Sequence, residues 1–266
     1  MHIRLFVFQW WFRAPGLAIR RRKVNKLEQL ENPDSTESLK AVRNRVAKHY
    51  PSKTQRHYVS NKLRSDPVYE AVFKLLEKHC QLPLLDVGCG IGLLEFYLRE
   101  REIHTPILAI DHDIKKIKTS NLIADSHYQD LRFIAGYIDS ELPAQPGNVT
   151  LLDILQYNNE RDQEDILRKA SEAVAPGGLL IIRSGLNDSS KRSKISKIAD
   201  RFGTFISWIK SSVHEFPTES FVSDILQSEG LQGESKPLWG NTPFNNYLLT
   251  YRRPHTNESA AGKTQR

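Results

Sequence analysis

Short apolar runs alternate with amphipathic stretches between residues 83 and 183. The apolar runs have the length and composition of buried strands, and the stretches between them repeat apolar residues at helical spacing. We expect strands at 83–87, 106–111, 131–136, 148–155 and 179–183, and helices at 91–101, 113–123 and 160–174. Unbroken apolar strands separated by helices of about 10–15 residues predict a parallel sheet covered on both faces.

The sequence on either side of this region adds further elements. Helices are expected at 39–47 and from Pro67 onward, where Asp66 is a suitable N-cap. After the sheet, helices are expected at 189–210 and 218–228, and a last strand at 245–253. The predicted fold class is therefore α/β: a doubly wound, Rossmann-like sheet, mostly parallel with an antiparallel C-terminal strand, plus N-terminal helices.

Three glycines follow the first strand in "PLLDVGCGIGLLEFYLRE", residues 83–100. Glycines at such a turn let a ligand approach the main chain and let the next helix pack closely on the sheet. A dinucleotide motif that begins at Gly88 requires a glycine at position 93, which is Leu93. Asp86 would repel a pyrophosphate but can accept hydrogen bonds from an ammonium group. The turn therefore favours a cofactor that carries an amino-acid moiety.

Asp111 ends the second predicted strand, "PILAID". A carboxylate at this position can accept hydrogen bonds from both hydroxyls of an adenosine ribose. NAD would satisfy it equally well, so Asp111 alone leaves the two cofactor classes open.

Four successive segments, "LLDVGCGIGLL", "ILAIDHD", "NVTLLDILQY" and "VAPGGLLII", resemble the motifs of class I S-adenosylmethionine-dependent methyltransferases. The resemblance covers residues 83–183. It implies that the protein is a methyltransferase with S-adenosylmethionine as cofactor. The resemblance also implies which residues contact each part of the cofactor. Asp111 would hold the ribose, and His112 would pack beside the adenine. The methionine part would be surrounded by the residues of the glycine turn: Asp86, Gly88, Cys89, Gly90 and Gly92.

The third strand departs from the family pattern. Many relatives have an acidic residue directly after the glycine that closes this strand, but here Tyr137 follows it and Asp139 comes two positions later. We expect Tyr137 to stack on the adenine or Asp139 to reach it. Lys62, or Arg64, is expected to bind the cofactor carboxylate, which none of the core motifs neutralises.

The acceptor side is predicted from strand ends and from the C-terminal region. Asp153, Gln156 and Tyr157 lie at or after the fourth strand, where family members place residues around the transferred methyl group. We assign Asp153 to the cofactor, Gln156 to the substrate, and Tyr157 and His214 as candidate catalytic residues. An aromatic and amide patch is expected to contact a flat substrate, and it contains Trp239, Asn241, Phe244 and Asn245. No metal site is expected.

Two outer segments, "RHYVSNKLRSDPVYEAV" and "PLWGNTPFNNYLL", resemble a narrower group of bacterial methyltransferases found in aryl polyene biosynthesis clusters. This resemblance implies a small aromatic or polyene-linked acyl substrate, which could be carried by a carrier protein.

The formal net charge of +7 is unevenly distributed. Residues 1–67 contain 15 Lys and Arg against 5 Asp and Glu, whereas the remainder is slightly acidic. An RNA methyltransferase that uses the basic segment is thus one alternative, although "DILQY" stands where many nucleic-acid amino methylators have an N-P-P-Y-type tetrapeptide. Two further classes stay open, an NAD-binding oxidoreductase and a non-catalytic protein that binds S-adenosylmethionine. We expect a small-molecule substrate and no nucleic acid.

The remaining sequence features predict the cellular compartment of the protein and the boundaries of its domains. Two cysteines and no export signal predict a cytoplasmic protein. The apolar run 5–12 is too short to span a bilayer, although its tryptophans and the arginines that follow would suit weak contact with a membrane surface. We expect a basic, poorly ordered leader at 1–35, a helical segment at 36–80, the methyltransferase domain at 81–253 with a helical addition near 186–230, and a disordered tail at 254–266.

Overall fold

The computed structural model describes residues 33–79, 81–138, 147–188, 215–240 and 245–255. The fold below is that of Val42–Arg266, which forms one compact unit. Several predicted features lie outside the described residues: most of the leader, the helix at 189–210, Asp139, His214, Asn241, Phe244 and most of the tail.

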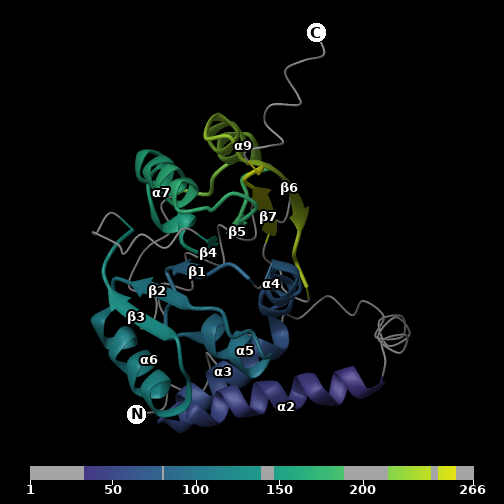
Figure 1. Cartoon of the computed structure of the whole chain (residues 1–266), viewed down its shortest axis with the longest axis vertical. Helices are drawn as coiled ribbons and strands as arrows, with labels where there is room; N and C mark the ends of the chain where they lie inside the picture. The colour runs from purple at the N-terminus through teal and green to yellow at the C-terminus, as the bar shows by residue number, and fades with distance from the viewer. Residues whose placement is uncertain (1–32, 80, 139–146, 189–214, 241–244, 256–266) are drawn as a thin grey trace, which may run out of the picture. The chain divides into compact units, whose positions relative to one another are not determined.

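The chain forms a seven-stranded sheet in the order β3-β2-β1-β4-β5-β7-β6 (Figure 1). The central strand β1 (Leu84–Val87) pairs in parallel with β2 (Ile107–Asp111) and β4 (Asn148–Leu152). Parallel pairing continues to β3 (Leu131–Ala135) and to β5 (Leu179–Gly185). The predicted doubly wound, mostly parallel sheet is confirmed.

The C-terminal strand β7 (Asn246–Arg252) runs antiparallel to β5, as predicted. It also pairs with β6 (Gln232–Pro237), which the sequence pattern did not indicate. β6 forms the outer edge of the sheet, and most of its residues are exposed. Its sequence "QGESKP" therefore lacks the apolar alternation by which strands are recognised.

Side chains of successive strand residues alternate between two apolar cores. Leu84, Ile107 and Ile181 belong to the core that contains helices α4 (Val68–Leu76), α5 (Leu93–Glu100) and α6 (Ile114–His127). We call this side of the sheet the α5 face. Leu85, Val149 and Ile182 belong to the opposite core, under α7 (Glu160–Glu172) and α9 (Glu219–Ser228).

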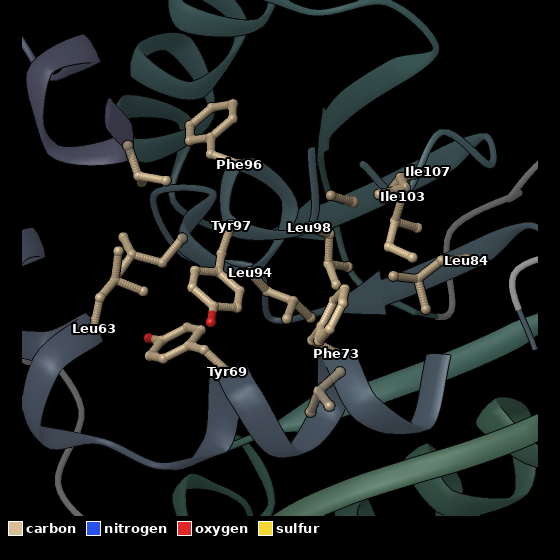
Figure 2. Packing of buried hydrophobic residues seen from close by; sticks show 14 of the residues in the cluster. Leu63, Tyr69, Phe73, Leu84, Leu94, Phe96, Tyr97, Leu98, Ile103 and Ile107 are labelled. Atoms are coloured by element: carbon tan, nitrogen blue, oxygen red, sulfur yellow. The ribbon is translucent and has the colours of Figure 1, made fainter. Parts of the chain in front are cut away.

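Residues of the N-terminal helices from Val42 onward also belong to the core of the α5 face. Helix α2 spans Pro33–His49, and α3 spans Lys53–Ser65, which lies within the predicted helical segment 36–80 although its own bounds were not predicted. Ser52 caps α3 and forms a capping box with Gln55. In Figure 2, Leu63 of α3 and Tyr69 of α4 face Leu94 and Tyr97 of α5. The segment before the sheet is thus part of the core.

Strand β4 is shorter than predicted. It ends at Leu152, and Asp153 then adopts a positive φ of 60° before a short 3-10 helix at Leu155–Tyr157. The apolar residues beyond Leu152 suggested a longer strand. Leu155 is indeed fully buried, but it belongs to the 3-10 helix and not to the strand.

No helix in the described part of the chain is long and apolar enough to cross a membrane.

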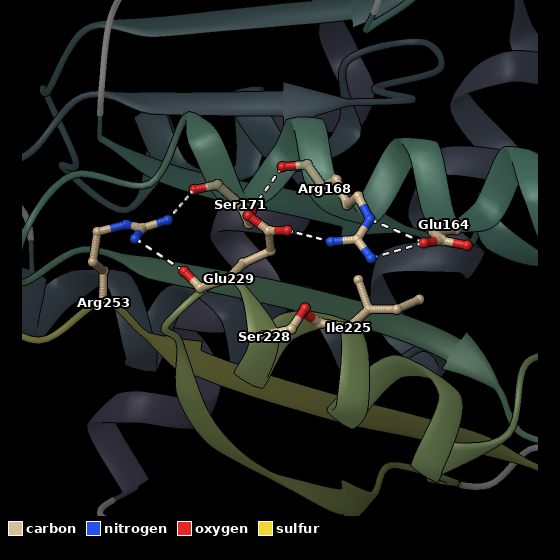
Figure 3. A network of polar contacts seen from close by, with 7 residues as sticks. All are labelled: Glu164, Arg168, Ser171, Ile225, Ser228, Glu229 and Arg253. Atoms are coloured by element: carbon tan, nitrogen blue, oxygen red, sulfur yellow. Dashed lines mark hydrogen bonds and ion pairs between the residues drawn. The ribbon is translucent and has the colours of Figure 1, made fainter.

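Arg253, just after β7, connects the ends of the helices on the other face (Figure 3). Its guanidinium donates to the carbonyl oxygens of Ser171 at 2.8 Å, Val174 at 2.9 Å and Glu229 at 3.2 Å. These carbonyls lie at the C-terminal ends of α7 and α9, where a cation is favourable. Arg168 of α7 forms a second link, an ion pair with Glu229.

Replacing Arg253 with methionine is therefore expected to lower the free energy of unfolding by about 1–3 kcal/mol, since buried carbonyl oxygens lose charged donors. The exposed neighbour Arg252 is the matched control, and Arg252→Met is expected to stay within about 0.5 kcal/mol of wild type. Urea unfolding of the three proteins measures both values. Equal stability of the two variants would contradict this role for Arg253.

Candidate functional site

The turn between β1 and α5 uses its three glycines in different ways. Gly88, Gly90 and Gly92 have φ values of 82°, 61° and 81°, a region that favours glycine. A Cβ at Gly88 would lie 2.2 Å from Ile154, and one at Gly92 would lie 2.8 Å from Phe96. A Cβ at Gly90 would meet nothing within 4 Å. Gly88 and Gly92 thus allow close packing, while Gly90 faces open space that a ligand could use.

Asp111 connects this turn to the end of β2. Its carboxylate accepts a hydrogen bond from the Gly90 amide at 2.9 Å and one from the Asp113 amide at 2.8 Å, through different oxygens. The residue is only 6% exposed. Because an ionised carboxylate offers about four acceptor positions, each oxygen keeps capacity for a further donor. This arrangement fits the two hydroxyls of a ribose.

Two planar side chains lie beyond Asp111. The rings of His112 and Tyr137 are nearly parallel, with an interplanar angle of 15° and centroids 5.9 Å apart. Tyr137 is 65% exposed. The structure therefore brings together the two residues that were predicted to pack against adenine, one after β2 and one after β3.

Asp86 lies on the α5 face of β1 and is 2% exposed. Thr150, its register partner on β4, donates its hydroxyl to the Asp86 carboxylate at 2.5 Å. Cys89 of the turn is partly buried, and burial raises the pKa of its thiol well above the ordinary value. Cys89 is therefore protonated at neutral pH and contributes through its main chain and its packing.

A cluster of four charged side chains lies where β4 and β5 end. Arg183 of β5 forms ion pairs with Asp153 and, at 3.0 Å, with Asp66. Lys62 forms an ion pair with the same Asp66 at 2.7 Å. We call these four residues the acceptor-side cluster. The sequence pattern indicated Lys62 and Asp153 but not Arg183, which follows the apolar run of β5 and is 117 positions from Asp66.

The charges of this cluster shift each other's protonation. Burial alone would raise the pKa of Asp66, but the nearby Lys62 and Arg183 charges hold it below the ordinary value. Burial raises the pKa of Asp153, against the opposing effect of Arg183. Because Lys62 pairs with Asp66, its predicted contact with the cofactor carboxylate would require it to exchange this partner.

The 3-10 turn after β4 holds the two residues predicted next to the transferred methyl group. Gln156 is 7% exposed, and its side-chain oxygen has no hydrogen-bond partner among the described residues. Tyr157 is half-buried beside it in the same turn. A buried amide oxygen without a donor is uncommon in proteins and marks a place where a ligand or water is accommodated.

The predicted aromatic and amide patch is described only in part. Trp239 is 36% exposed, and its ring meets the edge of Tyr247 at a centroid distance of 6.4 Å. Asn245 is 1% exposed and donates its side-chain amide to the Leu186 carbonyl at 3.0 Å. Asn245 therefore joins the ends of two paired strands, which is a structural role that the sequence pattern did not indicate.

Among the described residues, no group of three or more His, Cys, Asp or Glu side chains could hold a metal ion. Asp86 and Asp111 lie on neighbouring parallel strands and on the same face of the sheet, and Gly90, which faces open space, donates its amide to Asp111. This donor set fits a cofactor with an ammonium group at one end and a ribose at the other.

A family model described as a methyltransferase domain matches residues 78–215 of this chain. The chain belongs to this methyltransferase family. S-adenosylmethionine is the cofactor that the fold and the family imply, in agreement with the sequence motifs. No curated protein matches the chain at a significant level.

Solved structures of methyltransferases share the fold. An O-methyltransferase family protein from Burkholderia thailandensis is 16% identical, with a TM-score of 0.58 over 77% of this chain and 61% of that one. Magnesium protoporphyrin IX methyltransferase from Synechocystis PCC 6803, solved with bound S-adenosylhomocysteine, is 13% identical, with a TM-score of 0.56 over 86% of this chain and 99% of that one. The chain spans about three fifths of the length of the first structures it matches.

Proposed function

We propose that this protein transfers the methyl group of S-adenosylmethionine to a small organic acceptor that binds beside the acceptor-side cluster. The observation that carries this proposal is the buried, unpartnered oxygen of Gln156 next to Tyr157, directly after β4. A hydroxyl or carboxylic acid group of a small acceptor can donate to such an oxygen, and ligand sites combine a few placed polar groups with apolar walls.

Charge supports a small molecule over a nucleic acid. The sequence after residue 67, which contains the whole sheet, carries 23 Lys and Arg against 26 Asp and Glu. A site that binds RNA needs a basic surface to contact phosphates. The positive charge of the chain lies in residues 1–67, of which the most basic part falls outside the described residues.

The narrower resemblance suggests the acceptor class. The segment "RHYVSNKLRSDPVYEAV" contributes Lys62 and Asp66 to the acceptor-side cluster. The segment "PLWGNTPFNNYLL" contributes Trp239, whose exposed ring would suit a flat substrate. The two segments that resemble the aryl polyene group also meet, since a Cβ at Gly240 would lie 2.9 Å from Pro67, the residue after Asp66. We therefore propose an aromatic or polyene-pathway acceptor, free or bound to a carrier protein.

When bound, S-adenosylmethionine supplies an electrophilic methyl group. The residues of this chain hold the two reactants in line, and such alignment can lower a barrier by about 7–11 kcal/mol. A carboxylic acid acceptor is already ionised at neutral pH, whereas a phenol with a pKa of about 10 needs a base. Tyr157 and His214 are our candidates for that proton transfer. Asp86, Asp111 and the glycine turn bind the donor, and Lys62 and Asp153 approach it from the acceptor side.

The cytoplasm is the compartment we propose, on the basis of the two cysteines and the reducing environment that they imply. We also propose that the helical segment 36–80 and the sheet domain 81–253 act as one catalytic unit. Buried residues of α3 and α4, including Leu63 and Phe73, share the core of the α5 face with the sheet.

A labelling experiment tests the proposed acceptor class. The purified protein is incubated with S-adenosylmethionine that carries a radiolabelled methyl group and with cell extract, which is then separated into small molecules, RNA and protein. We expect label in the small-molecule fraction, or on a carrier protein from which mild hydrolysis releases a small acyl compound. Label found only in RNA would contradict the proposal and support an RNA methyltransferase.

A further inference from the structure

Glu95 is a fully buried acid that the proposed chemistry does not use. It lies in the first turn of α5, is 0% exposed, and neither of its carboxyl oxygens accepts a hydrogen bond among the described residues. Glutamates are almost never fully buried without a partner, because an ionised carboxylate loses its hydration. Some other feature of the site must therefore compensate for its burial.

The group that faces Glu95 is Asp86. Helix α5 starts at its N-cap Gly92, and side chains in a first helical turn point back toward the N-terminus, which here means toward β1. Asp86 projects from β1 onto this same face, close enough for its charge to raise the pKa of Glu95. Two ionised carboxylates buried next to each other repel, so the pair favours holding one proton.

Within the part of the chain that the structure describes, the groups around the pair do not supply a cation that could replace this proton. Arg99, one turn further along α5, donates to the carbonyls of Ile103, Thr105 and Asp130. On the other sides are the Cys89 thiol and Tyr50, whose hydroxyl donates to the Ile91 carbonyl at 2.8 Å.

Burial also raises the pKa of Asp86, but the hydrogen bond from Thr150 favours its ionised form, so Glu95 is the better placed of the two to hold the proton. Burial, and then the neighbouring Asp86, raise the pKa of Glu95 well above the ordinary value. Asp86 already accepts from Thr150 and gains a second donor when Glu95 is protonated.

We propose that Glu95 is a positioning residue: in the cofactor-free protein its protonated carboxyl donates to Asp86, and it releases this proton when the ammonium group of the cofactor binds at Asp86. The proposal rests on the proposed placement of the amino-acid part of the cofactor. The step is a simple acid dissociation. One O–H bond of Glu95 breaks, its electron pair stays on the carboxylate, and the proton passes to solvent.

The direction of the coupling between cofactor binding and the Glu95 proton follows from the charges of the groups involved. The pair carries a charge of −1 before binding, and the arriving ammonium group favours the ionised form of Glu95, so the bound state has the lower pKa. Binding then releases up to about one proton, and affinity rises by up to about tenfold per pH unit between the two pKa values. At higher pH the cofactor's own amino group, with a pKa of about 7.7–8.0, loses its proton and affinity falls again.

Calorimetric titration with S-adenosylhomocysteine tests this, with repeats at pH 6–8 in buffers of different ionisation enthalpy. The wild type is expected to release protons on binding. Glu95→Gln keeps a donor to Asp86 but has no proton to release. This variant should therefore bind S-adenosylhomocysteine without releasing protons, and its affinity should change less with pH on the acidic side. Glu100→Gln is the matched control on the same helix, because Glu100 pairs with Arg45 and Tyr128 instead, and it should behave as wild type.

Equal proton release by wild type and Glu95→Gln would overturn the proposal, and so would the absence of release by the wild type at every pH. The second result does not depend on the folding of any variant, and thermal melting checks that Glu95→Gln is folded. If S-adenosylhomocysteine does not bind the wild type at all, the proposed function fails as well. Binding without proton linkage would reject only the role of Glu95.

Discussion

Replacement of Gly90 with valine is expected to abolish measurable binding of S-adenosylhomocysteine while leaving the protein folded. A Cβ at this position meets no protein atom within 4 Å, so the added side chain would occupy only the space proposed for the cofactor. The φ of 61° adds strain of about 1–2 kcal/mol for a residue with a Cβ. Calorimetric titration measures binding, and circular dichroism confirms folding.

Gly230 provides a control for the strain. It has a φ of 78°, and a Cβ there would come no closer than 4.0 Å to another residue, the side chain of Arg253. Gly230→Val therefore imposes comparable backbone strain at the end of α9, on the other side of the sheet. We expect it to lower stability but to bind with the affinity of wild type. If Gly90→Val also binds normally, the cofactor does not occupy this space.

The second large effect is expected at Arg183. Replacing it with leucine removes the cation that pairs with Asp66 and Asp153. The two carboxylates then lie near each other without the guanidinium that neutralised them. Breaking a buried ion pair in this way costs about 3–5 kcal/mol. Urea unfolding should show a loss of this size, and a loss below about 1 kcal/mol would contradict the structural importance of the acceptor-side cluster.

An exposed ion pair gives the comparison. Lys236 pairs with Glu234 on the edge strand β6, with both side chains more than 60% exposed. Exposed pairs contribute about 0–1 kcal/mol, so Lys236→Leu should change stability little. Both variants remove one cation, so the contrast compares a buried cluster with two ion pairs to a single exposed pair.

Much of the cofactor side was predictable because its signals are local in the sequence. The spacing of Gly88, Gly90 and Gly92 after a strand indicated a turn that contacts a ligand, and the structure adds that only Gly90 faces open space. The apolar runs located the five parallel strands to within a few residues. The match to the methyltransferase family supports the choice of S-adenosylmethionine over a dinucleotide.

The features that were missed depend on contacts between distant segments. An arginine at the end of an apolar strand, such as Arg183, normally indicates the strand boundary, and only the fold brings Asp66 to it. Glu95 in a first helical turn usually faces solvent and favours the helix dipole, but here that face packs on β1. Strand β6 is held by pairing with β7, which no pattern in its own residues reveals.

The central claim is that Asp86, Gly90 and Asp111 form the S-adenosylmethionine site. Parallel calorimetric titrations of wild type and Asp111→Ala with S-adenosylhomocysteine and with NAD test it most directly. Charged hydrogen bonds to the ribose contribute about 1.5–3 kcal/mol each, so Asp111→Ala should bind S-adenosylhomocysteine well over tenfold more weakly than wild type, and NAD should bind neither protein. Tight binding of NAD by the wild type, or equal affinity of the two proteins for S-adenosylhomocysteine, would contradict it.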